Sequence, residues 1–315
     1  MERSDYRLTS ARDGAPIAVT EITADAPRFC VQITHGMAEH RLRYVPFLTW
    51  LAERGGACII HDMRGHGETA GAENYGYFGE DAVEGVLADT DQVGDVLRRR
   101  YPAQPFVLLG HSMGTLVARA YAAAHDEKLD GLLLTGEVSA NPAAGAGLAL
   151  ARLLALFRGE RGHSKMIDSM TLGPFAKAFP GETDPLAWLS ADEANRRAYE
   201  ADAACGFTFT LNGYAVLFSL LKRVYQPKEW NVRHRTMPIR FYSGEDDPVM
   251  IGKKQFNAAA RFLSDMGYAD VSAKLCPGMR HEILNETDRA AIWEELAGVI
   301  EAIPQTRGGD GTQER

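Results

Sequence analysis

The sequence has little of several features that mark special classes of protein. Only 4 of its 315 residues are cysteine, and their dispersal excludes a disulfide framework. Acidic residues outnumber basic ones by 42 to 34, and the net charge of −8 argues against nucleic acid as a partner. No apolar run reaches the ~18 residues of a membrane span, and charged residues 1–7 lack the apolar stretch of a signal peptide. We therefore expect a cytoplasmic protein with reduced thiols.

What the chain does have is a regular alternation of apolar runs and amphipathic stretches. The pattern predicts strands near residues 29–34, 57–61, 105–110, 131–137, 238–243 and 271–276, and helices near 43–54, 81–100, 115–125, 253–266 and 287–302. Alternation of this kind favours an α/β fold in which helices cover both faces of a mostly parallel sheet. Two early runs, 6–9 and 17–22, are expected to form an antiparallel hairpin at one edge.

The interval 139–235 is far too long for a loop between neighbouring strands. We therefore expect an α/β core made of residues 1–138 and 236–303, a helical cap over 139–235, and a disordered tail at 304–315. The predicted cap helices are 148–157, 190–203 and 211–224, the second of which opens with a capping box from Ser190 to Glu193.

Residues 148–157 are apolar on nearly every face, at a length that cannot span a bilayer. They are expected either to pack on the core or on a partner subunit, or to lie at a lipid surface. The cap carries a net charge of +3 and the rest of the chain −11, which would favour an anionic interface. The sequence leaves the oligomeric state open.

Residues 110–114 have the sequence Gly-His-Ser-Met-Gly, directly between an apolar run and a helix-like stretch. A G-x-S-x-G turn in that context is a nucleophile elbow, in which the flanking glycines leave room for strand and helix to approach each other. Ser112 is therefore the candidate nucleophile, supported by Gly110 and Gly114. The alternative is an ordinary glycine-rich turn.

A serine nucleophile requires a base and an acid that orients the base. His281 follows the last predicted strand, and Asp246 and Asp247 follow the strand before it. The order serine, aspartate, histidine is the one used by α/β-hydrolases, and it differs from the orders of chymotrypsin-like and subtilisin-like enzymes. The residues alone do not separate Asp247 from Asp246.

The oxyanion that forms during acyl transfer requires hydrogen-bond donors. A His-Gly loop follows the first apolar strand of the core, which is where this fold places its second donor. We expect the backbone N–H groups of Met37 and Met113 to be the donors. His35 and Gly36 are expected to support the loop, and His40 to buttress it.

His61, Asp62 and His66 have side chains of the types that bind zinc, so they are candidates for a metal site. No second pair with zinc-like spacing completes the set, so no metal or organic cofactor is expected.

Five ordered motifs together resemble the lysophospholipase and monoacylglycerol lipase branch of the α/β-hydrolases, which includes serine aminopeptidase-like relatives. They lie at residues 35–40, 62–67, 110–114, 244–247 and 280–282. The resemblance selects Asp247 as the acid, by its spacing from the preceding glycine. Met37 departs from the family, which often has a small residue there, and its side chain is expected to narrow the acyl pocket.

The resemblance implies hydrolysis of a lysophospholipid or monoacylglycerol through an acyl-enzyme on Ser112. A small-ester carboxylesterase or a prolyl aminopeptidase-like amide hydrolase would keep the same triad. A non-catalytic ligand receptor with this fold is a further alternative, which the complete triad disfavours.

Overall fold

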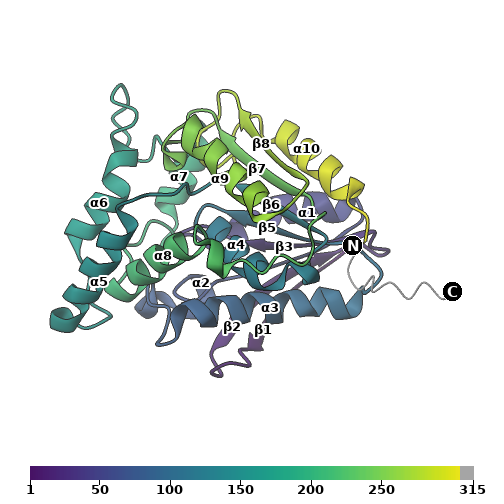
Figure 1. Cartoon of the computed structure of the whole chain (residues 1–315), viewed down its shortest axis with the longest axis horizontal. Helices are drawn as coiled ribbons and strands as arrows, with labels where there is room; N and C mark the ends of the chain where they lie inside the picture. Colours follow the sequence, from purple (N-terminus) through teal and green to yellow (C-terminus); the bar gives the residue numbers. More distant parts are fainter. Residues whose placement is uncertain (306–315) are drawn as a thin grey trace.

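The computed structural model describes residues 1–305, and the predicted tail lies mainly outside them. A sheet of eight strands runs through this part of the chain in the order β1-β2-β4-β3-β5-β6-β7-β8 (Figure 1). The strands are β1 (Glu2–Thr9), β2 (Pro16–Thr23), β3 (Phe29–Thr34), β4 (Gly56–His61), β5 (Phe106–His111), β6 (Gly131–Thr135), β7 (Ile239–Gly244) and β8 (Val271–Cys276). The six strands from β3 to β8 are mutually parallel, and the β1–β2 hairpin joins them antiparallel through β4.

Helices cover both faces of the sheet, as the alternating pattern predicts. On one face, α1 (Val45–Glu53) and α10 (Arg289–Ala302) share an apolar cluster with β3 and β4. On the other, α3 (Ala82–Arg100), α4 (Met113–His125) and α9 (Lys253–Met266) form a second cluster. Because β3, β4, β5 and β6 are buried along their whole lengths, their sequences are almost continuously apolar.

Shorter helical turns connect these elements. They are η1 (Arg41–Tyr44), α2 (Gly67–Ala70), η2 (Ala72–Asn74), η3 (Asp126–Lys128), η4 (Pro227–Glu229) and η5 (Pro248–Met250).

Four helices lie between β6 and β7, gathered beyond one end of the sheet (Figure 1). They are α5 (Ala144–Arg158), α6 (Lys165–Ala176), α7 (Glu193–Ala201) and α8 (Leu211–Arg223). Helix α8 packs against α5, α4 and α3, so it connects this insertion to the rest of the molecule. The division into core and cap at residues 139 and 235 stays a prediction.

Two expectations for the insertion are wrong. Helix α6 had no counterpart in the prediction, because Gly173 and Pro174 within it weaken the helical signal. The N-cap residue of α7 also differs from the one predicted. Asp192 accepts hydrogen bonds from the first backbone N–H groups of the helix, whereas the Ser190 hydroxyl donates to Glu286.

Helix α5 buries only one side of its apolar surface. Leu148 and Ala151 are buried, whereas Leu156 and Phe157 are each 81% exposed. Among residues 1–305, no helix combines the length and the apolar character that a bilayer crossing requires.

Candidate active site

Ser112 occupies the sharp turn between β5 and α4. Its backbone angles, φ 52° and ψ −122°, are rare for a residue with a side chain. The flanking glycines are required by close approach: a Cβ on Gly110 would lie 2.5 Å from the carbonyl oxygen of Gly114, and one on Gly114 would lie 2.0 Å from that of Thr34. The turn therefore holds the serine at the end of the sheet in a fixed, strained conformation.

His281 and Asp247 meet at the ends of the last two strands. The Nδ1 atom of His281 lies 2.9 Å from Oδ2 of Asp247, and both side chains are buried. The second oxygen of Asp247 accepts from the backbone N–H of Val249 at 2.9 Å, which fixes the carboxylate. Asp246 is exposed to solvent. Of the two candidate aspartates, the structure thus places Asp247 against the histidine.

The loops that carry these two residues touch through their backbones. A Cβ on Gly244 would lie only 2.0 Å from the carbonyl oxygen of Arg280, so glycine allows the contact. Backbone hydrogen bonds from Glu245 to Cys276 (2.9 Å) and from Asp246 to Met279 (3.1 Å) hold the loops together.

Ser112 and His281 line one cavity of about 940 Å³. Its floor is the carboxyl end of the sheet, and its walls are largely apolar side chains of the insertion, including Leu150, Ile167 and Phe218. Gly136 leaves space for the histidine, since a Cβ there would lie 3.0 Å from Cε1 of His281.

The His-Gly loop presents one unused backbone donor to this cavity. The N–H of Gly36 donates to Glu39 at 2.5 Å and that of Ala38 donates to His66 at 3.1 Å. Between them, the N–H of Met37 donates to no acceptor in residues 1–305, and the same holds for the N–H of Met113. These two groups are free to bind an oxyanion, and that role stays a prediction.

The supports of this loop differ from those expected. His35 does brace it, because its Nε2 accepts from the N–H of Met63 at 2.9 Å and its Nδ1 lies 2.8 Å from the carbonyl of Gly36. His40 turns away, with its Nε2 at 2.8 Å from Asp202 in the insertion. The bracing predicted for His40 is instead made by His66, because its ring lies beneath the loop.

Arg43 connects the His-Gly loop to the loop that carries His281. Its guanidinium lies between Glu39, at 2.7 Å, and Glu282, at 2.5 Å, and both carboxylates are buried. Asn195 of α7 donates to Glu282 at 2.7 Å, so the insertion joins the same network. Glu39 is the residue that holds the N–H of Gly36, and Glu282 follows His281. One cation therefore fixes the oxyanion loop relative to the histidine.

Two buried histidines in the site have pKa values that are shifted in opposite directions. Burial lowers the pKa of His281, but the Asp247 carboxylate outweighs this effect and holds the pKa above the ordinary 6.5. Burial lowers the pKa of His111 to about 4, and the nearby His281 adds to the decrease. At neutral pH, His111 is therefore uncharged and contributes packing, with its ring centroid 5.0 Å from that of His281.

Two of the three residues considered for metal binding make other contacts. Asp62 pairs with Arg41, while His66 accepts from the oxyanion loop. His61 is buried in β4, where neither ring nitrogen has a partner within residues 1–305.

The one His, Cys and acid cluster in residues 1–305 compact enough to hold a metal ion consists of His40, Asp202 and Cys205. There, Nδ1 of His40 accepts from the N–H of Leu42, so Nε2 carries the proton and donates it to Asp202. This arrangement fits a hydrogen-bonded pair.

Sequence reasoning missed Arg43, Glu282 and the tryptophan beside the histidine, Trp188. The Trp188 ring lies 5.3 Å from the His281 ring and comes from the insertion, 93 positions earlier in the chain. The only sequence feature that could have indicated the Glu39–Arg43–Glu282 network is the four-residue spacing of Glu39 and Arg43, which is typical of an ion pair within one helical turn.

The chain is similar to known proteins over most of its length. A family model described as serine aminopeptidase, S33, matches residues 25–288. Monoacylglycerol lipase of Mycolicibacterium smegmatis is 26% identical over 275 residues, 87% of this chain and 88% of the relative.

Solved structures show the same architecture. A carboxyl esterase from Bacillus coagulans in complex with glycerol has a TM-score of 0.88 at 25% identity, over 96% of this chain and 99% of that one. A soluble variant of monoglyceride lipase from Saccharomyces cerevisiae in complex with a substrate analogue has a TM-score of 0.72 at 18% identity, over 97% and 96%. The α/β-hydrolase fold expected from the sequence is confirmed.

Removing the charge of Arg43 should destabilise the protein strongly. In Arg43→Met, two buried carboxylates lose their shared cation, which we expect to lower the free energy of unfolding by about 3–5 kcal/mol. Urea denaturation measures the loss. Arg99→Met, which removes a side chain that is 73% exposed, is the control and should change stability little. Equal stability of the two variants would contradict the proposed role of Arg43.

The pKa of His281 should depend on Asp247 and not on Asp246. NMR titration should give a value above 6.5 for wild type and one below 6.5 for Asp247→Asn, where burial acts without the carboxylate. Asp246→Asn is the matched control. Because the folded-state pKa is raised, the stability from this pair is complete below pH 6.5 and is lost as pH rises through the pKa of His281. If the pKa of His281 decreased only in Asp246→Asn, Asp246 and not Asp247 would be the partner of the histidine.

Proposed function

Because the chain belongs to the serine aminopeptidase S33 family of hydrolases, we propose that it cleaves carboxylic esters with lipid-like acyl chains through a serine nucleophile. The observation that carries the proposal is the convergence of a strained Ser112 and a buried His281–Asp247 pair on one large, mostly apolar cavity. Monoacylglycerols and lysophospholipids are the substrate class that this cavity suits.

In the proposed reaction, Ser112 Oγ attacks the ester carbonyl while Nε2 of His281 takes its proton. Asp247, hydrogen-bonded to Nδ1, holds the imidazole in the required tautomer and stabilises the imidazolium that forms. The unused N–H groups of Met37 and Met113 receive the oxyanion. His281 then protonates the departing alcohol, and water, activated by the same histidine, releases the acid.

The lining of the cavity favours an acyl chain over a free N-terminus. Three carboxylates line it: Glu39 and Glu282, which share the cation of Arg43, and Asp168, which accepts from Tyr214. Most of the lining surface is apolar. The apolar walls favour a hydrocarbon chain.

We also propose that the insertion contacts a lipid surface. Exposed apolar side chains gather on α5 and α6; they are Leu153, Leu156, Phe157, Met166 and Met170. Met170 also lines the cavity, so the patch adjoins the place where an acyl chain would enter. Arg158 ends α5, Lys165 begins α6 and Arg161 lies between these helices, and their charges would complement anionic lipid headgroups.

Ester hydrolysis should rise with acyl length and depend on Ser112. We expect kcat/KM for p-nitrophenyl esters to increase from acetate to laurate, because each methylene buried in the cavity adds favourable transfer free energy. Ser112→Ala should lose about 10³-fold or more of the activity. Monoacylglycerol and lysophosphatidylcholine assays then rank the headgroups.

The same assay separates the alternatives. If kcat/KM were highest for the acetate ester, the protein would be a small-ester hydrolase. If wild type hydrolyses no ester and is not labelled by a fluorophosphonate, the chain is a non-catalytic binding protein. Full activity in Ser112→Ala would rule out the proposed nucleophile.

Binding to vesicles should depend on the exposed end of α5. We expect Leu156→Ser/Phe157→Ser to lower partitioning onto phosphatidylglycerol vesicles by about tenfold or more, because two apolar side chains no longer enter the interface. Sedimentation with the vesicles measures the bound fraction. Leu42→Ser, which changes an exposed leucine of η1, is the control and should bind as wild type does. Unchanged binding by the double variant would remove the proposed contact.

A further inference from the structure

The connection between α6 and α7, residues 177–192, supplies the cavity wall nearest the histidine. Pro185, Leu186, Trp188 and Leu189 line the cavity. The Trp188 ring lies 5.3 Å both from His281 and from Phe175 at the end of α6. The position of this connection therefore affects the space next to the catalytic centre.

The second half of the connection is fixed to the core through its backbone. The carbonyl of Leu189 accepts from the N–H of Glu282 at 2.8 Å, and that of Trp188 accepts from His281 at 3.4 Å. The buried carboxylate of Glu286 accepts from the N–H groups of Ala191 and Asp192, at 2.9 and 3.1 Å. These contacts should keep residues 188–192 in place even when residues 177–187 move.

The first half, residues 177–187, is held differently. Its backbone hydrogen bonds stay local, from Ala178 to Phe175, Glu182 to Phe179 and Ala187 to Asp184. Contact with the fixed parts of the molecule is made by two arginines. Arg280, the residue before His281, pairs with Glu182 and donates to the carbonyl of Ala187.

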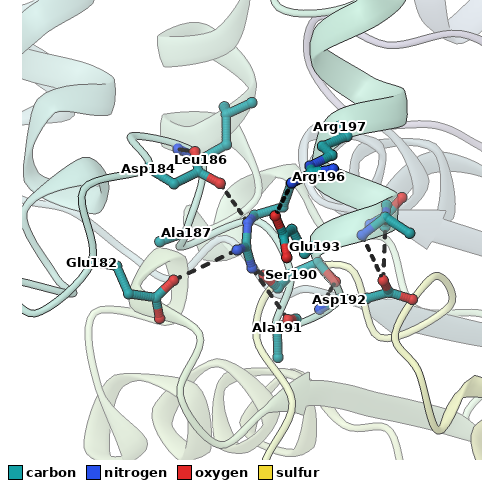
Figure 2. Close-up of polar contacts among 12 residues, drawn as sticks. Glu182, Asp184, Leu186, Ala187, Ser190, Ala191, Asp192, Glu193, Arg196 and Arg197 are labelled. Carbon is teal, nitrogen blue, oxygen red and sulfur yellow. Dashed lines mark hydrogen bonds and ion pairs between the residues drawn. The ribbon is translucent and has the colours of Figure 1, made fainter.

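The second arginine, Arg196 of α7, lies between the two acids of the connection (Figure 2). Its Nε donates to Asp184 at 2.6 Å, and its Nη2 lies 3.7 Å from Glu182. Its Nη1 donates to the carbonyl of Ser190 at 2.7 Å, which joins the loosely held half to the fixed half. The guanidinium groups are largely buried, whereas Glu182 and Asp184 are about one third exposed.

We propose that Glu182 and Asp184 determine acyl-chain selectivity, because their ion pairs with Arg280 and Arg196 hold residues 177–187 so that Pro185 and Leu186 form part of the cavity wall. This inference rests on the proposed function. Ion pairs whose acids are partly exposed to solvent are weak and are screened by salt, so a small free energy holds this part of the wall. A long acyl chain needs the wall in place, whereas an acetyl group reaches only the serine and its donors.

The test compares Glu182→Gln/Asp184→Asn with wild type on p-nitrophenyl laurate and acetate. We expect KM for laurate to rise about tenfold, with kcat and the acetate KM within about twofold, because the wall loosens while the triad stays anchored. Added sodium chloride should raise the laurate KM of wild type toward that of the double variant, and should change the variant little.

Figure 2 also contains the matched control, the Glu193–Arg197 pair on the exposed side of α7. Glu193→Gln removes an acid of the same kind that contacts no cavity residue, and it should behave as wild type at every salt concentration. The proposal would be overturned if Glu193→Gln and the double variant raised the laurate KM equally, or if neither variant changed it.

Hydrogen exchange provides a readout that needs no activity. Amides of residues 177–187 should exchange faster in the double variant than in Glu193→Gln, while those of 188–192 stay protected. Unchanged hydrogen exchange of residues 177–187 would overturn the proposed role of the ion pairs, even if the enzyme cleaves laurate. Absence of ester cleavage by wild type, with faster exchange in the variant, would reject the proposed function and leave the wall contact standing.

Discussion

A single guanidinium, that of Arg43, joins the parts of this molecule that must act together. It bridges Glu39, which holds the oxyanion loop, and Glu282, which follows the histidine. Burying three charges is unfavourable unless each is paired and hydrogen-bonded. Here the remaining acceptor positions are filled by the Gly36 N–H, the Tyr44 hydroxyl and Asn195. One satisfied network therefore fixes the His-Gly loop relative to His281.

Close backbone contacts do the rest of the positioning. Gly114 lets the nucleophile helix approach β3, and Gly244 lets the aspartate loop approach the histidine loop. A methyl group at either position would meet a carbonyl oxygen at 2.0 Å. These contacts leave little freedom in the core, whereas residues 177–187 of the insertion are held to it by the side chains of Arg196 and Arg280. The molecule therefore combines a closely packed floor of the cavity with one wall segment that is held mainly by side chains.

Much of this arrangement could be predicted from the sequence, because buried parallel strands and amphipathic helices leave strong periodic patterns. The strand ends then indicated where Ser112, Asp247 and His281 would lie. Tertiary contacts escaped prediction. Ser190 looked like a helix cap, yet it binds Glu286, 96 positions away. Helix α6 was hidden by Pro174, and Trp188 gave no local sign that it would face the histidine.

The backbone of Ser112 has a further consequence. A residue with a side chain at φ 52° and ψ −122° holds conformational strain on the order of 1–3 kcal/mol, which the surrounding fold must overcome. Glycine would relax that strain, so the chain should fold more stably with glycine at position 112 than with serine. Stability alone therefore does not account for a serine at this turn.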